Sequence, residues 1–196
     1  MYRSQLSITG NRLFDDAVFI ILALIAISML GNISFEAVDG VNSTLQSLLV
    51  VFFSLLLGLR VGLTSVILYL IIGGLGLPVF SNGASGWSYF QGMTGGFLLA
   101  FPIGALISGA AAEWAATNDF TKRFSFITGA LILLISQLAI LILGSFWYNS
   151  MMFDDDIMSH LSIMIEAYSP GLLVKTALGT IIFVIFGRIL SRVIKS

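Results

Sequence analysis

Six long apolar stretches constrain this chain more than any other feature of its sequence. They lie at residues 17–33, 44–59, 61–77, 95–112, 124–147 and 172–194. A helix needs about 20 predominantly apolar residues to cross the hydrocarbon core of a bilayer. Only 10% of the residues are charged, whereas a soluble domain carries about 25%. The sequence therefore predicts an all-α integral membrane protein, in which one domain covering residues 1–196 contains six transmembrane helices.

The charges predict the orientation of these helices. One side of the predicted bundle carries eight of the nine cations, namely Arg3, Arg12, Arg60, Lys122, Arg123, Arg188, Arg192 and Lys195. The loops of the other side have acidic residues and no Lys or Arg, namely Glu36, Asp39, Asp154, Asp155, Asp156 and Glu166. The positive-inside rule assigns the basic side to the cytoplasm. We therefore expect both termini to be cytoplasmic.

The ninth cation, Lys175, lies inside the sixth apolar stretch. Because Pro170 favours the first turn of a helix, we expect Lys175 about one turn into this helix, at its outer end. A charge within a membrane segment costs a few kcal/mol and commonly marks a functional site. One interpretation is a lysine that snorkels to the outer headgroups. We favour the other, a cation that faces a cavity and binds an anion there.

The segment at residues 74–96 is unusual for a loop between membrane helices. It has seven glycines and four aromatic residues but no charge. The predicted topology places it on the outer side, where Lys175 also lies. An aromatic belt at the membrane interface explains Trp and Tyr, but it explains neither the glycines nor the missing charge. We therefore expect the segment to fold back as a lid or plug, which is tolerated at membrane depth only where protein or a cavity satisfies the backbone.

Several classes of function find little support in the sequence. The chain has no cysteine and a single histidine, His160, so we expect no metal site, cofactor or thiol chemistry. Asp154–Asp156 are the best candidates for an enzyme's carboxylates, but a solvated loop explains them better. The chain lacks a phosphate-binding GxxxxGK[ST] motif, so we expect any ATP hydrolysis to come from partner subunits. The net charge of −1 argues against nucleic acid as a partner.

Residues 45–109 resemble the BioY family, the biotin-specific S components of energy-coupling factor (ECF) transporters. The similarity lies in TLQ (Thr44–Gln46), LLLGLR (Leu55–Arg60), LYLIIGGLGLPVF (Leu68–Phe80) and GMTGGFLLAFP (Gly92–Pro102). The motif that opens the family's last helix, PGDLIK, reads PGLLVK here, at Pro170–Lys175.

The resemblance implies a substrate-binding subunit in a bacterial cell membrane that takes up a vitamin, biotin first among them, from the extracellular side. It also implies docking on a transmembrane coupling subunit driven by two ATPases, and a small-residue face on the first helix, for which Ala23 and Ala26 are the candidates. Lys175 is then expected to bind the ligand's acid group, with hydrogen bonds or apolar walls from Gln46, Asn82, Trp87, Tyr89, Thr94 and Tyr168.

Two departures from the family pattern leave the ligand open. Asn42 replaces the proline before the TLQ motif, and Leu172 replaces the aspartate of PGDLIK. Losing one buried hydrogen-bond partner costs about 1–3 kcal/mol, so a ligand with the same acid tail but a less polar ring, such as lipoate, is an alternative to biotin. A self-sufficient secondary carrier is a further alternative. Such carriers usually place ionisable residues near the bilayer midplane, and the middles of the six apolar stretches carry no charge.

Overall fold

The structure is a computed structural model that describes residues 9–38, 41–118, 125–152 and 157–193. Six long helices make up most of it: α1 (Arg12–Leu30), α2 (Gln46–Leu57), α3 (Leu59–Gly74), α4 (Gly95–Thr117), α6 (Ser125–Met152) and α7 (Ile157–Val193). Strands β1 (Ser34–Val38) and β2 (Val41–Thr44) form an antiparallel hairpin before α2. Two 3₁₀ turns, η2 (Ser81–Gly83) and η3 (Trp87–Gln91), lie between α3 and α4. The chain is thus mostly helical, as predicted, with a small hairpin that the all-α prediction missed.

By length and composition, four of the described helices can cross a membrane: α1, α4, α6 and the part of α7 at Leu161–Ile189. The remaining two long helices, α2 and α3, are apolar but shorter, with 12 and 16 residues. The six predicted stretches therefore correspond to six helices. That all six span the bilayer remains a prediction.

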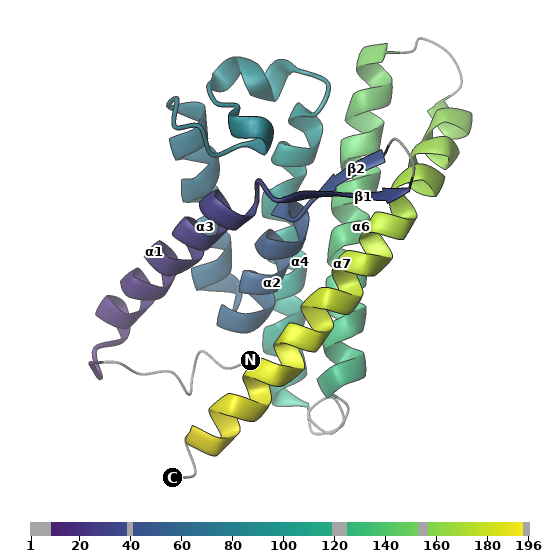
Figure 1. Cartoon of the computed structure of the whole chain (residues 1–196). Coiled ribbons are helices and arrows are strands. Elements are labelled where there is room, and N and C mark those ends of the chain that lie inside the picture. Colours follow the sequence, from purple (N-terminus) through teal and green to yellow (C-terminus); the bar gives the residue numbers. More distant parts are fainter. Residues whose placement is uncertain (1–8, 39–40, 119–124, 153–156, 194–196) are drawn as a thin grey trace.

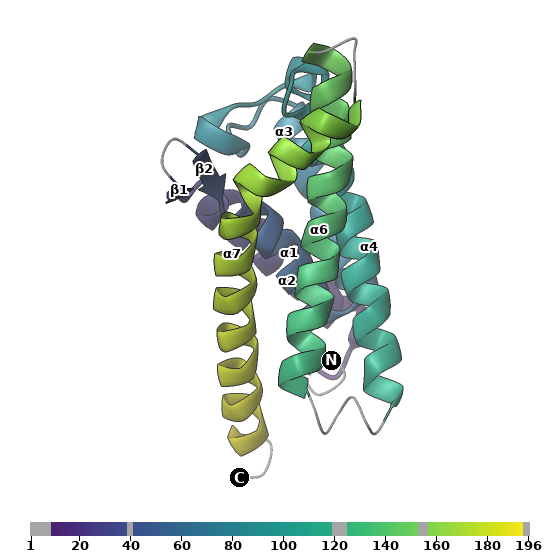
Figure 2. The same ribbon diagram turned by 90° about the vertical axis from the view of Figure 1, so that its right-hand side faces the viewer.

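The short helix α2 is the centre of the bundle. It contacts α1, α3, α4, α6 and α7, and Val50 and Val51 on it are fully buried. Around it, α4 and α6 run side by side, α7 packs against α6, and α1 packs against α3 (Figures 1 and 2). A helix that is apolar on all sides belongs in such a central position.

The described helix ends that carry or adjoin the cations predicted to be cytoplasmic lie at one end of the bundle. The start of α1, the α2–α3 junction, the end of α4 and the end of α7 all lie at the lower end in Figure 1. Arg60 at the junction lies 3.8 Å from the carboxylate of Asp16 on α1, and the Leu59 backbone N–H donates to Glu113 of α4 at 3.0 Å. The segment between α3 and α4 lies at the opposite, upper end.

Glycines allow the helices around this junction to approach closely. A Cβ on Gly62 would collide with Ser54 of α2, and one on Gly109 would lie 2.5 Å from the Leu59 Cα. In both cases the obstacle includes backbone, which cannot rotate away. Small residues at such crossings let helices pack closely where lipid provides no hydrophobic driving force.

The predicted helix bounds differ from the observed ones at several helix ends. The second helix starts at Gln46 rather than at 44, because Val41–Thr44 pair with β1. Helix α1 starts at Arg12 rather than at 17, since the side chain of Asn11 caps it by accepting from the N–H groups of Leu13 and Phe14. Helix α6 continues past Trp147 to Met152.

The largest difference is in the last helix, which begins at Ile157 instead of at 172. Pro170 therefore lies inside α7 rather than in its first turn, and Figure 2 shows the helix bent along its length. A proline removes one helical N–H and leaves the carbonyl four residues earlier, here Glu166, without its donor. The Ser169 hydroxyl donates to that carbonyl at 3.1 Å, which explains how the helix continues through the proline.

Candidate functional site

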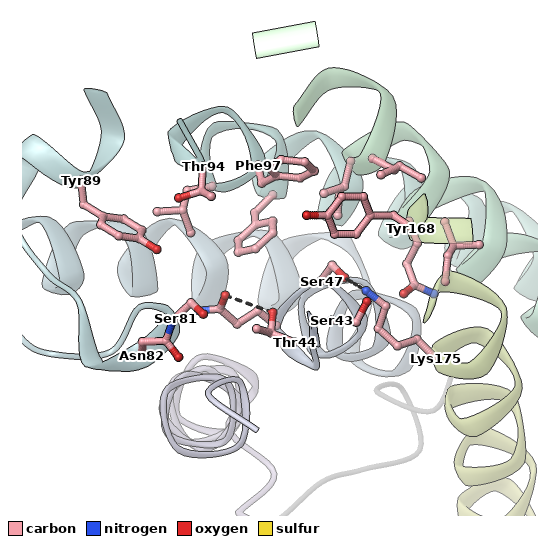
Figure 3. Close-up of a pocket in the computed structure, with 17 residues that line it drawn as sticks. Ser43, Thr44, Ser47, Ser81, Asn82, Tyr89, Thr94, Phe97, Tyr168 and Lys175 are labelled. Carbon is pink, nitrogen blue, oxygen red and sulfur yellow. Dashed lines mark hydrogen bonds between the residues drawn. The ribbon is translucent and has the colours of Figure 1, made fainter. Parts of the chain in front are cut away.

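A cavity of about 250 Å³ lies at the upper end of the bundle, between the start of α2, the segment after α3, and helices α4, α6 and α7 (Figure 3). Its apolar wall consists of Phe97, Leu98, Phe101, Ile140, Leu141 and Leu172. Its polar lining consists of Ser43, Thr44, Gln46, Ser47, Ser81, Asn82, Tyr89, Thr94, Gln137, Tyr168 and Lys175. Apolar walls with a few convergent polar groups are typical of sites for small molecules.

Lys175 provides the charge in this cavity. Its Nζ donates to the Ser47 hydroxyl at 2.9 Å, and Ser43, buried at the end of the hairpin, lies beside both side chains (Figure 3). Within the described ranges no carboxylate pairs with Lys175. A cation held by a neutral hydroxyl in a largely apolar cavity favours the binding of an anion.

The far end of the cavity from Lys175 is polar but uncharged. Ser81, Asn82 and Thr44 gather there, with Tyr89 above them (Figure 3). Asn82 has a left-handed backbone conformation, φ 57°, which Asn tolerates better than most residues. Its side chain is exposed and lines the cavity. Amide and hydroxyl groups here can both donate and accept hydrogen bonds.

A buried chain of hydrogen bonds joins the cavity to the segment above it. Gln46 donates through Nε2 to the Tyr69 hydroxyl at 2.7 Å, and Tyr69 donates to the Val79 carbonyl at 2.9 Å. The Gln46 Oε1 accepts weakly from the Thr44 hydroxyl at 3.4 Å. The orientation of the Gln46 amide is therefore set by α3 and by the segment after it.

We call residues 75–94, between α3 and α4, the cap. Its core is Phe80, which is fully buried. The ring of Phe80 stacks on Tyr89 and meets Tyr69 and Phe90 edge to face, with ring centres 5.4–5.6 Å apart. The Trp147 indole on α6 donates to the Gly92 carbonyl at 3.1 Å. The cap is thus a packed structure that contributes Ser81, Asn82, Tyr89 and Thr94 to the cavity.

Six of the seven residues proposed from the sequence line this one cavity: Gln46, Asn82, Tyr89, Thr94, Tyr168 and Lys175. Trp87 does not line it. Its side chain is 60% exposed and packs against Gly74 and Phe90 on the outside of the cap. The packing of Phe80 and Phe90 turns Tyr89 inward, and sequence alone does not show which aromatic residue faces in.

The predicted docking pair is half wrong. Ala23 is 1% exposed and belongs to the hydrophobic core of the chain, so it is not available to a partner. Ala26 is partly buried, and its docking role stays a prediction. Residues 153–156, with the three aspartates, and the side chain of His160 lie outside the described part of the structure.

Sequence reasoning missed five polar residues that line the cavity: Ser43, Thr44, Ser47, Ser81 and Gln137. Ser43 and Ser47 flank the TLQ motif, and only the hairpin turns Ser43 toward Lys175. Gln137 could have been predicted from the sequence, because it is an amide within the apolar run ALILLISQLAILIL. Polar residues inside membrane segments are commonly functional.

The BioY family model matches residues 4–192 of the sequence. The chain belongs to the BioY family. The chain is 35% identical over 92 residues to a probable biotin transporter BioY of Pyrococcus horikoshii, a match over 47% of the chain and 57% of the relative. It is also 35% identical over 104 residues to the biotin transporter BioY2 of Lactococcus lactis, over 53% of each. The matched part thus spans just over half the length of these two BioY proteins.

A solved structure shares the fold of this BioY chain over almost its full length. It is the crystal structure of an S-component for biotin from an ECF-type ABC transporter, with a TM-score of 0.72. The match covers 97% of this chain and 96% of the other, at 22% sequence identity. The helical arrangement of this chain is therefore the one seen in that solved structure.

Proposed function

We propose that this chain is the substrate-binding S component of an ECF-type importer and that it binds biotin, or a closely similar cyclic carboxylate, from the extracellular side. The observation that carries the proposal is the cavity beneath the cap, with the cationic Lys175 at one end and neutral hydrogen-bonding groups at the other. A ligand with an acid tail and a polar ring complements both ends. The names of the relatives, which are biotin transporters, support the same ligand.

In this proposal each part of the cavity has a separate task. Lys175 binds the ligand's carboxylate, replacing the Ser47 hydroxyl as its partner. Asn82, Gln46 and Thr94 form hydrogen bonds with the ring, while Tyr89 and Tyr168 pack against the ligand's apolar atoms. Hydrogen bonds to a charged group contribute about 1.5–3 kcal/mol, so the lysine should dominate recognition of the acid.

Leu172 makes the ring specificity a separate question. It is 6% exposed and lines the cavity one helical turn before Lys175, where the family motif has an aspartate. An apolar side chain here cannot accept a hydrogen bond from a polar ring of the ligand, as an aspartate could. Lipoate, with an apolar dithiolane ring, is therefore the matched competitor in the binding experiment.

The decisive experiment titrates the purified chain in detergent or nanodiscs with biotin and with lipoate, following tryptophan fluorescence and calorimetry. We expect saturable binding of biotin, and weaker binding of lipoate. Tighter binding of lipoate would reassign the ligand. Absence of binding for both would overturn the proposal.

Import is proposed to depend on partners: a transmembrane coupling subunit and two ATPases. Co-expression of the tagged chain with an ECF coupling module should yield a complex that takes up labelled biotin in vesicles only with ATP inside. Uptake driven by an ion gradient in vesicles that contain this chain alone would instead support a secondary carrier.

A further inference from the structure

Gln137 on α6 has an unusual arrangement at the wall of the cavity. It is 2% exposed and lines the cavity together with Lys175. Its Nε2 donates to the Thr176 hydroxyl at 3.1 Å and to the Leu133 carbonyl at 3.4 Å. Its Oε1 is buried and has no hydrogen-bond partner. A buried acceptor without a partner costs free energy, and in native proteins such atoms commonly occur at functional sites.

The surroundings of Gln137 place it beside the cationic end of the cavity. Thr176, which holds its amide, is the residue after Lys175 on α7. One turn further along α7, a Cβ on Gly179 would touch the apolar side chains of Leu48 and Leu133. Gln137 and Thr176 therefore form a polar floor between the cavity and the apolar core.

The Gln137 amide has a second arrangement in which both of its polar atoms have partners once an acceptor is bound in the cavity. A half-turn of the amide exchanges Oε1 and Nε2. Oε1 then accepts from the Thr176 hydroxyl, which can donate as well as accept. The NH₂ group gives up the long 3.4 Å contact with Leu133 and becomes available beside Lys175. It needs an acceptor there, and a carboxylate bound by Lys175 supplies one.

We propose that Gln137 is a direct ligand contact that completes the carboxylate site: it donates through Nε2 to the acid group bound by Lys175, and Thr176 positions it. The inference rests on the proposed function and adds to it a residue from α6 that selects acids over neutral analogues. In the empty protein the amide faces Thr176 with its nitrogen. In the ligand-bound protein it faces Thr176 with its oxygen.

The test compares biotin with its neutral amide, biotinamide, in three variants. We expect Gln137→Leu to lower the affinity for biotin about tenfold to a hundredfold and the affinity for biotinamide less than about threefold. Gln137→Glu should weaken biotin further, because a second carboxylate then faces the ligand's own. Thr176→Val should weaken biotin less, and should add little to Gln137→Leu in a double-mutant cycle, as a positioning residue does.

Ser136→Ala is the matched control. Ser136 is the preceding residue, fully buried, with a hydroxyl that also lacks a partner, but it is not among the residues that line the cavity. Its substitution should leave both affinities unchanged. If Gln137→Leu weakens the affinity for biotin and for biotinamide equally, Gln137 contacts the ring rather than the acid group, and the inference is overturned. An unchanged affinity for both ligands would also overturn it.

A measurement without ligand tests the same inference when biotin is not the ligand. If the amide is retained for binding, the ligand-free Gln137→Leu protein should unfold at the same temperature as the unmodified chain or higher, because the unpaired acceptor is gone. A marked fall in its unfolding temperature would make Gln137 a structural clamp between α6 and α7 and overturn the proposal. Failure of the unmodified chain to bind biotin or lipoate overturns the proposed function instead.

Discussion

At the scale of single residues, Lys175 decides the chemistry of the cavity. Its partner within the described residues is a hydroxyl, not a carboxylate, so the positive charge is not neutralised by an acidic side chain. Replacing it with an apolar side chain of similar length separates its role in binding from its role in packing.

We expect Lys175→Met to weaken an acid ligand about tenfold to a hundredfold and its amide little, as measured by calorimetry with biotin and biotinamide. Ser47→Ala serves as the control, because it removes the hydroxyl that holds the ammonium but keeps the charge, and should change affinity less. Equal weakening of acid and amide in Lys175→Met would remove the lysine from the acid-binding role.

Leu172 allows a second prediction about single residues. Leu172→Asp introduces an acceptor for a polar ring in a wall that is apolar in this chain. The ratio of biotin to lipoate affinity should rise. The aspartate can accept a hydrogen bond from a ring N–H of biotin, whereas it loses hydration without gaining a partner when it faces the apolar dithiolane ring of lipoate. Competition titrations on this variant and on Leu172→Asn measure the ratio. A fall in that ratio for both variants would show that Leu172 does not face the ring.

Much of the site was predictable at this scale because chemistry marks its residues. A lysine within an apolar stretch and a neutral glycine-rich segment both stand out in the sequence, and both border the cavity. The predictions for Trp87 and Ala23 were wrong for a common reason. Which side of the cap or of α1 a residue faces depends on packing against other elements, here Phe90 for Trp87 and the central core for Ala23, and composition does not contain that information.

At the scale of elements, the hydrogen-bond chain from Gln46 through Tyr69 to Val79 ties the cap to the helices beneath it. Tyr69→Phe keeps the ring that packs on Phe80 and removes only the hydroxyl. We expect a loss of about 1–3 kcal/mol in local stability, seen as faster hydrogen exchange in the cap, with α4 and α6 unchanged. Uniformly faster exchange would show that Tyr69 stabilises the whole bundle instead.

The glycines of α4 provide a matched pair of variants. Gly109→Ala brings a Cβ onto the backbone of Leu59, whereas Gly104→Ala meets first the terminal atoms of Ile140, which can rotate. We expect Gly109→Ala to destabilise by about 1–3 kcal/mol and Gly104→Ala by less, since a helical alanine also gains propensity. Thermal unfolding in detergent compares them. A larger loss for Gly104→Ala would contradict the close approach of α4 to the α2–α3 junction.

The elements also show where sequence periodicity stops being informative. Hydropathy located all six helices, because long apolar runs are required in a bilayer. It placed the start of α7 15 residues too late, since 157–171 is polar enough to resemble a loop and Pro170 resembles a helix start. The Ser169 hydroxyl donates to the Glu166 carbonyl, which the proline leaves without a donor. The periodicity of apolar residues does not indicate such a local hydrogen bond.

At the scale of the whole molecule, the charge distribution predicts that the cap is extracellular and the α2–α3 junction cytoplasmic. The chain has no cysteine, so single cysteines report topology without background. In intact cells, Ser88→Cys in the cap should react with a membrane-impermeant maleimide. Thr117→Cys, at the end of α4, should react only after permeabilisation. The reverse pattern would invert the proposed direction of transport.

The walls of the cavity come from four separate parts of the chain, and Lys175 is contributed by α7, which follows α1 to α6 in the sequence. A ribosome-bound chain that has inserted α1 to α6 already contains the cap, but it lacks the cation and one entire wall. If the proposed function holds, ligand binding requires that α7 has inserted and packed against α6. Labelled ligand would then report how many molecules have completed the cavity.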